Sequence, residues 1–239
     1  LPEVTAIALG GSRSGETYDE TSDYDLYIYC TSIPDEDSRK LILTQYCSYM
    51  EISNQFWELE DDCTLNNDID IDILYRNIRD FARDIENVVE KHQAGNGYTT
   101  CFWHNLKTCK ILYDANGEFG KLKKRFDVPF ASRNFSLLTG HLPSYDMQIL
   151  KAAKRKDFVS VNHRVAAFLE SYFDIIFAVN ELTHPGEKRM ISYAAAHANL
   201  LPNQFEQSLN TLLMSITASP EILEKQLKDM IANLAEILS

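Results

Sequence analysis

Two aspartates spaced one residue apart, Asp23 and Asp25, have the type and spacing that suit metal-dependent chemistry. They lie in the stretch GGSRSGETYDETSDYDLYIY, residues 10–29, after its Gly-Gly-Ser turn. Alternate side chains of a β-strand point to the same face, so both carboxylates face one way. Packing gives a half-buried strand no reason to place two acids there. Proteins hold Mg²⁺ with one or two carboxylates together with substrate phosphates, so the spacing predicts a metal site.

A third carboxylate comes from a later segment. Residues 68–75, DIDIDILY, alternate between Asp and Ile, which predicts a strand with its isoleucines inward and its aspartates outward. A third acid would complete a platform for two metal ions. Asp72 is our candidate, and Asp70, on the same face, competes for that role. The competing interpretation of these acids is a solvated strand face on an acidic protein.

The glycines before the first two acids point to phosphate binding. Gly10 and Gly11 let the backbone come close to a triphosphate, with amide N–H groups and the Ser12 hydroxyl as donors. Gly11 and Ser12 are therefore candidate phosphate-binding residues. Arg13 follows them, and we expect it either to steady the phosphates or to form a surface salt bridge.

Strands and helices interleave in the first half of the chain. Residues 4–9 predict a buried strand that ends at the glycine turn, and residues 23–30 alternate as a second strand. A proline followed by acids predicts a helix that starts at residue 34 and continues to residue 50. We further expect an edge strand over residues 54–60 and a helix over residues 77–93.

The second half has the apolar spacing of helices throughout residues 145–239. Its clearest helix covers residues 158–182, and three more are expected near 188–199, 203–217 and 220–238. The fold class is therefore α/β (α+β): a small mixed sheet with helices on one face, followed by an all-α helical bundle.

This change of pattern predicts two domains. We place a catalytic domain at residues 1–125 and a helical C-terminal domain at residues 126–239, with the boundary near 125–143.

The net charge of −12 is unevenly distributed. Residues 1–120 hold 23 acids and 9 bases, a net −14, whereas residues 121–239 hold 12 acids and 14 bases, a net +2. An acidic first half repels a nucleic-acid backbone, so we do not expect a nucleic-acid partner. It attracts a divalent metal or a cationic small molecule, or it serves solubility alone.

The cysteine count favours a reducing compartment. There are five cysteines, an odd number, and none form a Cys-x-x-Cys pair. We expect reduced thiols in a cytoplasmic protein rather than a disulfide framework or a zinc site. No uncharged apolar run approaches 18 residues, so no membrane span is expected.

Several other residues have a functional and a structural interpretation. Lys188, at an expected helix start, either reaches a triphosphate or is a solvated lysine. The basic run KLKKR, residues 121–125, is either a solvated segment or a nucleotide or partner contact. Trp57, Trp103 and most tyrosines are expected in the core, although Tyr27 and Tyr29 share the acid face.

The stretch at residues 10–29 and the later DIDILYR at residues 70–76 resemble the nucleotidyltransferases of the DNA polymerase β superfamily. That family has Gly-Ser, then Asp-x-Asp on the next strand, then a third Asp on a later strand. Two further segments, ILYDANGEFGKLKK and FAVNELTHPGEKRM, resemble an uncharacterised bacterial subgroup. Its helical C-terminal domain is akin to that of aminoglycoside nucleotidyltransferases.

The resemblance implies an activity and roles for the motif residues. The family uses two Mg²⁺ ions to move a nucleoside monophosphate from a nucleoside triphosphate, here most simply ATP, to an acceptor hydroxyl, with release of pyrophosphate. Asp23 and Asp25 would bind metal, Asp72 would be the third acid, and Gly11 and Ser12 would hold phosphates. The triphosphate would bind between the two domains.

The acceptor and one rival class stay open at this point. The acidic half favours a cationic, aminoglycoside-like small molecule. A protein acceptor that receives AMP on Tyr, Ser or Thr is the second option. A nucleotide-binding or antitoxin-like module that pairs with a protein partner is the rival of a different class, and a plain structural domain is a third. The sequence leaves the oligomeric state undetermined.

Overall fold

The computed structural model describes residues 1–15, 18, 22–131 and 144–238. Two compact units form, each from two stretches of chain: residues 1–87 with 102–128, and residues 88–101 with 129–239. The expected boundary region at 125–143 lies partly outside the described residues. A division after residue 125 therefore stays a prediction.

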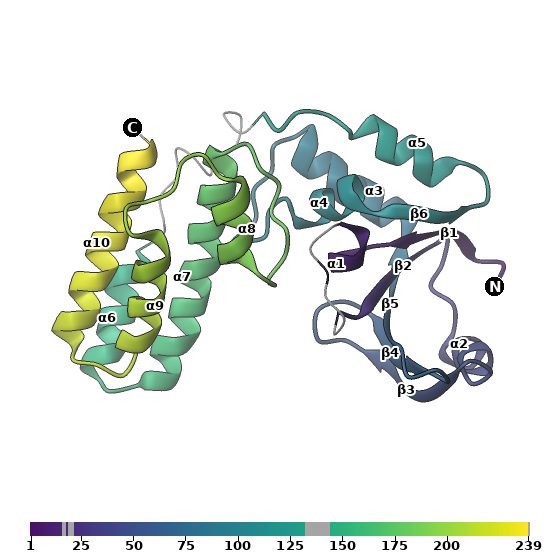
Figure 1. The fold of residues 1–239 in the computed structure, drawn as a ribbon, viewed down its shortest axis with the longest axis horizontal. Coiled ribbons are helices and arrows are strands. Elements are labelled where there is room, and N and C mark those ends of the chain that lie inside the picture. Colours follow the sequence, from purple (N-terminus) through teal and green to yellow (C-terminus); the bar gives the residue numbers. More distant parts are fainter. Residues whose placement is uncertain (16–17, 19–21, 132–143, 239) are drawn as a thin grey trace. The chain divides into compact units, whose positions relative to one another are not determined.

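The first unit is built on a six-stranded mixed sheet (Figure 1). The strand order is β3-β4-β5-β2-β1-β6; β2 and β5 are parallel, and the other pairs are antiparallel. Its elements are β1 (Val4–Leu9), α1 (Gly11–Ser14), β2 (Tyr24–Cys30), α2 (Glu36–Leu43), β3 (Cys47–Asn54), β4 (Glu60–Leu65), β5 (Asp70–Asn77), α3 (Ile78–Val89), α4 (Cys101–Thr108), β6 (Lys110–Asp114) and α5 (Glu118–Arg125).

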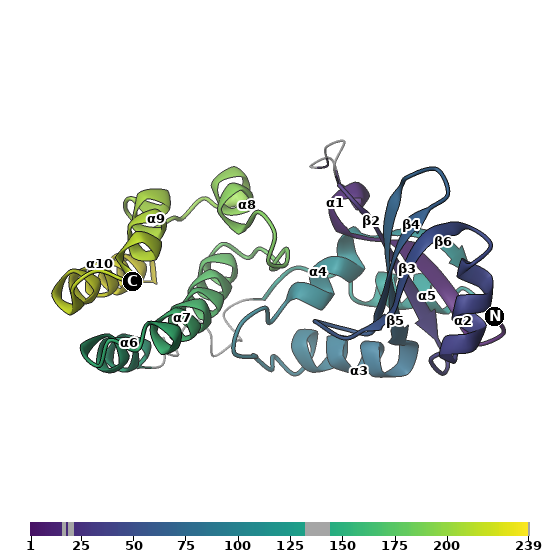
Figure 2. The ribbon, with the colours of Figure 1, turned by 90° about the horizontal axis from the view of Figure 1, so that it is seen from below.

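The two faces of the sheet pack differently. On one face the fully buried Tyr29 contacts Phe81 of α3 and Phe119 of α5, with ring centroids 5.0 and 4.1 Å away. Figure 2 shows the ribbons of these two helices beside the strands. On the other face Ile71 and Ile73 join a cluster that includes Leu43 of α2: Ile28, Cys30, Leu43, Cys47, Cys63, Ile71, Ile73 and Tyr75. Strand β2 is buried on both faces over its second half, which explains its continuous apolar sequence.

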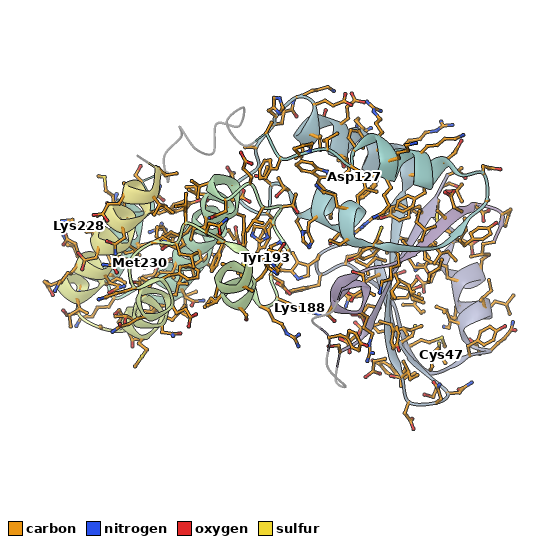
Figure 3. All side chains as sticks on the ribbon, turned by 45° about the horizontal axis from the view of Figure 1, so that its top comes forward. Cys47, Asp127, Lys188, Tyr193, Lys228 and Met230 are labelled. Atoms are coloured by element: carbon orange, nitrogen blue, oxygen red, sulfur yellow. The ribbon has the colours of Figure 1, made fainter. Side chains whose placement is uncertain are left out.

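The second unit is helical throughout its described secondary structure. Its helices are α6 (Tyr145–Lys154), α7 (Phe158–Val179), α8 (Met190–His197), α9 (Phe205–Ser215) and α10 (Pro220–Leu238). The buried stripe of α7 includes Val161, Val165, Phe168 and Tyr172, and it packs with Met230 of α10 (Figure 3). The predicted fold class, a mixed sheet with helices followed by a helical C-terminal part, is confirmed. The helices were expected on one face, whereas α2 packs on the face opposite to α3 and α5.

The expected helix over residues 34–50 is too long. Helix α2 ends at Leu43, and residues 47–54 form β3, the edge strand of the sheet. The apolar residues Leu41 and Tyr46 suggested a longer helix, but both are exposed, so a helical face there would bury nothing. The chain instead pairs with β4 and buries Cys47. The prediction of an edge strand at residues 54–60 is also wrong, because that segment connects the end of β3 to the start of β4.

The five cysteines are free thiols, as predicted. Burial raises the pKa of Cys30 to about 11 and that of Cys63 to about 12, so both stay protonated at neutral pH. Among the described residues, none of the helices combines the length and apolarity needed to cross a membrane.

A short stretch before α4 belongs to the helical unit. The backbone N–H and hydroxyl of Thr99 donate to the carboxylate of Asp174 in α7, the hydroxyl over 2.6 Å. The hydroxyl of Thr100 accepts from the backbone N–H of His184 over 2.8 Å. Both Asp174 and His184 are buried, so these bonds tie the stretch to the interior of the unit.

Asp174→Asn should make the stability of the protein less dependent on pH. Burial raises the pKa of Asp174 to about 6, although the bonds from Thr99 act the other way. The folded pKa lies above that of an unfolded Asp, so this carboxyl favours the fold below about pH 4, and that contribution is lost as pH rises through about 6. In melting curves recorded from acid to neutral pH, the melting temperature of the variant should increase relative to that of the wild type as pH rises.

An exposed acid on α10 provides the control for this measurement. Asp229→Asn should follow the wild-type pH dependence throughout. Parallel pH profiles for wild type and Asp174→Asn would contradict the role given to the buried carboxyl.

Candidate active site

The register of β2 with β5 brings two of the predicted acids side by side. Asp25 and Asp72 are direct partners in this parallel ladder. Neighbouring strands lie about 4.8 Å apart, and partners in a ladder face the same way, so the two side chains share one face. Both are partly exposed, and the face is that of Tyr27 and Tyr29 further along β2. Those tyrosines are buried, so the core interpretation of the pair is confirmed.

The Gly-Gly turn packs directly against this face. Gly11 has φ +56°, and a Cβ at Gly11 would overlap the carboxylate of Asp25. A Cβ at Gly10 would overlap the ring of Tyr27, and the Gly10 N–H donates to the backbone oxygen of Asp25 over 2.8 Å. The turn therefore requires glycine at two positions, and the structure places Gly11 in contact with Asp25.

Asp23 and Ser12 both lie outside the strands, Ser12 directly after the turn and Asp23 twelve residues after Gly11. Strand β2 begins at Tyr24, which pairs with Ile71, so Asp23 sits one residue before the ladder. Ser12 is partly exposed in the short helix α1, whose first residue is Gly11. The first backbone N–H groups of a helix have no acceptor within it, which leaves them available to an anion.

Two further acids continue the pair across the sheet, and the sequence analysis missed both. Asp62 of β4 is the ladder partner of Asp72, and Glu51 of β3 is the ladder partner of Asp62. Asp25, Asp72, Asp62 and Glu51 thus form one acidic row across four adjacent strands. Neither acid was predicted because the expected helix ran to residue 50 and the edge strand was expected at residues 54–60, whereas β3 covers residues 47–54.

Asp70, the competitor for the third acid, has a different environment. It is exposed, and its carboxylate accepts from the Thr64 hydroxyl over 2.7 Å. In the ladder it pairs with Thr64 of β4, whereas Asp72 pairs with both an acid of β4 and Asp25 of β2. The register therefore favours Asp72 as the partner of Asp25.

Negative charge accumulates beside the acidic row. Burial raises the pKa of Glu60 to about 7, and repulsion from Asp62, Asp72, Glu58 and Asp25 adds to the shift. Glu60 and these four acids make five carboxylates that repel one another. A cation bound among them would lower the electrostatic free energy of the region.

A buried arginine closes the far end of the same face. Arg76 of β5 binds Glu58 through two bonds, of 2.8 and 2.6 Å. Its guanidinium carbon lies 4.2 Å from the centroid of the Tyr27 ring. The Tyr27 ring also packs against Gly10, so Arg76 supports the glycine turn through this ring.

The donor chemistry of the site fits a hard divalent cation. Mg²⁺ is bound by oxygen ligands such as carboxylates, and Asp25 and Asp72 place two carboxylates on one face of the sheet. Within the described part of the chain, no group of three or more His, Cys, Asp or Glu side chains is already gathered at metal-binding distance.

The remaining sequence candidates lie elsewhere. Lys188 is exposed in the turn before α8, in the helical unit (Figure 3), and its contact with a triphosphate stays a prediction. The basic run at residues 121–125 lies in α5, where Lys123 donates to the backbone oxygens of Leu106 and Lys107 at the end of α4. Trp103 is buried as expected, but Trp57 is 61% exposed, so its core assignment is wrong.

Comparisons with known proteins give only distant similarities. The chain matches no protein-family model and no curated protein. The crystal structure of a nucleotidyltransferase-like protein from Exiguobacterium sibiricum 255-15 has a TM-score of 0.40 and 12% identity, over 99% of this chain and 69% of that one. An aminoglycoside 6-adenyltransferase from Bacillus subtilis has a TM-score of 0.27 and 10% identity, over 98% of this chain and 85% of that one. Scores this low do not decide the family.

Gly11→Ala should destabilise the protein more than a matched change elsewhere. The left-handed backbone of Gly11 costs about 1–2 kcal/mol for a residue with a side chain, and the new methyl must also displace the carboxylate of Asp25. Gly117→Ala is the control: it has φ +67°, but a Cβ there meets nothing within 4 Å. Urea unfolding of both variants measures the difference, and equal losses would contradict close packing of the turn on Asp25.

Proposed function

We propose that the protein is a metal-dependent nucleotidyltransferase that moves a nucleoside monophosphate from a nucleoside triphosphate to an acceptor hydroxyl. The single observation that carries this proposal is the placement of Asp25 beside Asp72 and against Gly11. A carboxylate pair that touches a glycine turn can hold a cation and a polyphosphate within a few ångströms of each other. ATP is the proposed donor.

The residues of the first unit divide the work of binding. Asp23, Asp25 and Asp72 hold two Mg²⁺ ions, while the backbone N–H groups at Gly11 and Ser12 and the Ser12 hydroxyl donate to phosphate oxygens. When bound, Mg²⁺ supplies positive charge that lowers the pKa of the acceptor hydroxyl and offsets the charge of the triphosphate. The protein otherwise contributes orientation, because phosphoryl transfer depends mostly on positioning and charge neutralisation.

The reaction exchanges one phosphorus–oxygen bond for another. The acceptor oxygen forms a bond to the α-phosphorus, the bond from that phosphorus to the oxygen bridging the α- and β-phosphates breaks, and pyrophosphate leaves. The hydroxyl proton passes to the carboxylate of Asp72.

The acidic row supports a cationic acceptor. Asp62 and Glu51 extend the row away from the Asp25–Asp72 pair, toward the edge of the sheet. A small molecule with several ammonium groups, such as an amino sugar, can place a hydroxyl at the pair and its charges along the row.

A protein acceptor is the alternative that a specific observation favours. Phe56 and Trp57 are exposed, at 77% and 61%, in the segment that joins β3 to β4, the two strands that carry Glu51 and Asp62. Exposed aromatic side chains are frequent in protein interfaces. This surface suits an AMPylating enzyme, or an antitoxin-like module that pairs with a protein.

Neutralising any acid of the proposed metal site should abolish nucleotide binding. Wild type should be stabilised against heat by one nucleoside triphosphate in the presence of Mg²⁺, since a ligand of the folded state raises the melting temperature. Asp23→Asn, Asp25→Asn and Asp72→Asn should each lose this shift and nearly all pyrophosphate release. Asp70→Asn is the control and should keep both.

Two outcomes would overturn the assignment. Retained turnover in Asp23→Asn and Asp25→Asn would refute the metal site. Loss in Asp70→Asn with retention in Asp72→Asn would move the third acid to Asp70.

Removing charge from the outer part of the acidic row should weaken acceptor binding without slowing chemistry. Glu51→Gln combined with Asp62→Asn should raise KM for a polycationic amino sugar several-fold, because each exposed charge pair contributes about 1 kcal/mol or less to binding. The value of kcat should stay nearly constant. Asp37→Asn, an exposed acid on α2, is the control. An unchanged KM in an enzyme that uses such acceptors would exclude this role of the row.

A further inference from the structure

Among the described residues, Arg13 has a hydrogen bond and two ring contacts with the segment from Tyr18 to Tyr24. Its Nε–H donates to the backbone oxygen of Ser22 over 2.7 Å. Its guanidinium carbon lies 4.1 Å from the centroid of the Tyr24 ring and 5.3 Å from that of Tyr18. The side chain thus combines a hydrogen bond with stacking on an aromatic face, which a planar guanidinium makes and an ammonium cannot reproduce.

Two of these contacts flank Asp23. Ser22 is the residue before it and Tyr24 the residue after it. Asp23 lies one residue before the first ladder pair of β2 with β5, Tyr24 with Ile71, so its position depends on its neighbours in the chain. Arg13 holds both neighbours, and it belongs to α1, the element that begins at Gly11.

The same side chain therefore joins the glycine turn to the first acid. The turn already contacts Asp25 directly, through Gly11. Asp23 has no equivalent place in the sheet, and the Arg13 contacts supply the connection from the turn to the residues around it.

We propose that Arg13 is a positioning residue that sets Asp23 beside Asp25, and that it acts through Ser22 and Tyr24 rather than by binding phosphate. The proposal rests on the nucleotidyltransferase function proposed above. It assigns the hydrogen bond and the planar stack of the Arg13 guanidinium to the support of a metal ligand. Groups that orient a ligand typically change metal affinity by about 10- to 100-fold.

The test separates this role from phosphate binding. Arg13→Lys keeps the charge that a phosphate would need, but it loses the Nε–H and the planar stack on Tyr24. We expect the Mg²⁺ concentration that gives half of the ATP-induced thermal shift to rise about tenfold, with the full shift restored at high Mg²⁺. Arg79→Lys, an exposed arginine on α3, should leave it unchanged.

A double-mutant cycle with Tyr24 gives the second readout. Tyr24→Leu, which leaves Arg13 charged, should raise the Mg²⁺ requirement in the same direction as Arg13→Lys. If Arg13 acts through its stack on Tyr24, the double variant should need little more Mg²⁺ than either single variant. Full additivity of the two effects, or an unchanged Mg²⁺ requirement in Arg13→Lys, would overturn the proposal.

A nucleotide-free measurement keeps the two proposals apart. Hydrogen exchange of the backbone from Ser22 to Asp25 should be faster in Arg13→Lys than in wild type and in Arg79→Lys. If no nucleoside triphosphate stabilises the wild type, the proposed function fails, and this exchange still decides whether Arg13 holds the segment. Unchanged exchange rules out the positioning role.

Discussion

The parallel pairing of β2 with β5 is the constraint on which the rest of the first unit depends. It is the one parallel pair among the described strands of the sheet, and it requires the chain to leave β2, form α2, β3 and β4, and return. A shift of one residue in its register would turn Asp72 to the apolar face and Ile71 or Ile73 to the acid face. Burial of those isoleucines therefore fixes the position of the acid.

The neighbouring acids Asp61 and Asp62 lie on opposite faces of the sheet. Asp61 is fully buried on the α2 side, where it pairs with Arg39 and accepts from the Ser53 N–H over 2.9 Å. Asp62 points to the other face, joins the acidic row and accepts from the Asn54 side-chain amide over 2.8 Å. The fully buried acid therefore has a buried opposite charge, as an ionised group removed from water requires.

Much of the fold and the centre of the site could be predicted from the sequence. Alternation over DIDIDILY and DYDLYIYC indicated β5 and β2, because each has a face that must be apolar, and the apolar stripe of α7 was equally clear. Strand β3 was not predictable from local spacing, since its apolar residues fit a helix until β4 pairs with it. Asp62 and Glu51 were missed with it: a row across strands depends on register, which one segment does not encode.

The interleaving of the two units has a consequence for how the chain is made. Residues 88–101 are synthesised between two stretches of the first unit, yet they belong to the second. Thr99 finds its acceptor Asp174 only 75 positions later, and Thr100 its donor His184 only 84 positions later. On the ribosome, the sheet can form well before this stretch has a place to pack. The stretch therefore has neither of these partners until residues 174 and 184 have been synthesised. Because the two units alternate along the chain, no single cut separates one from the other.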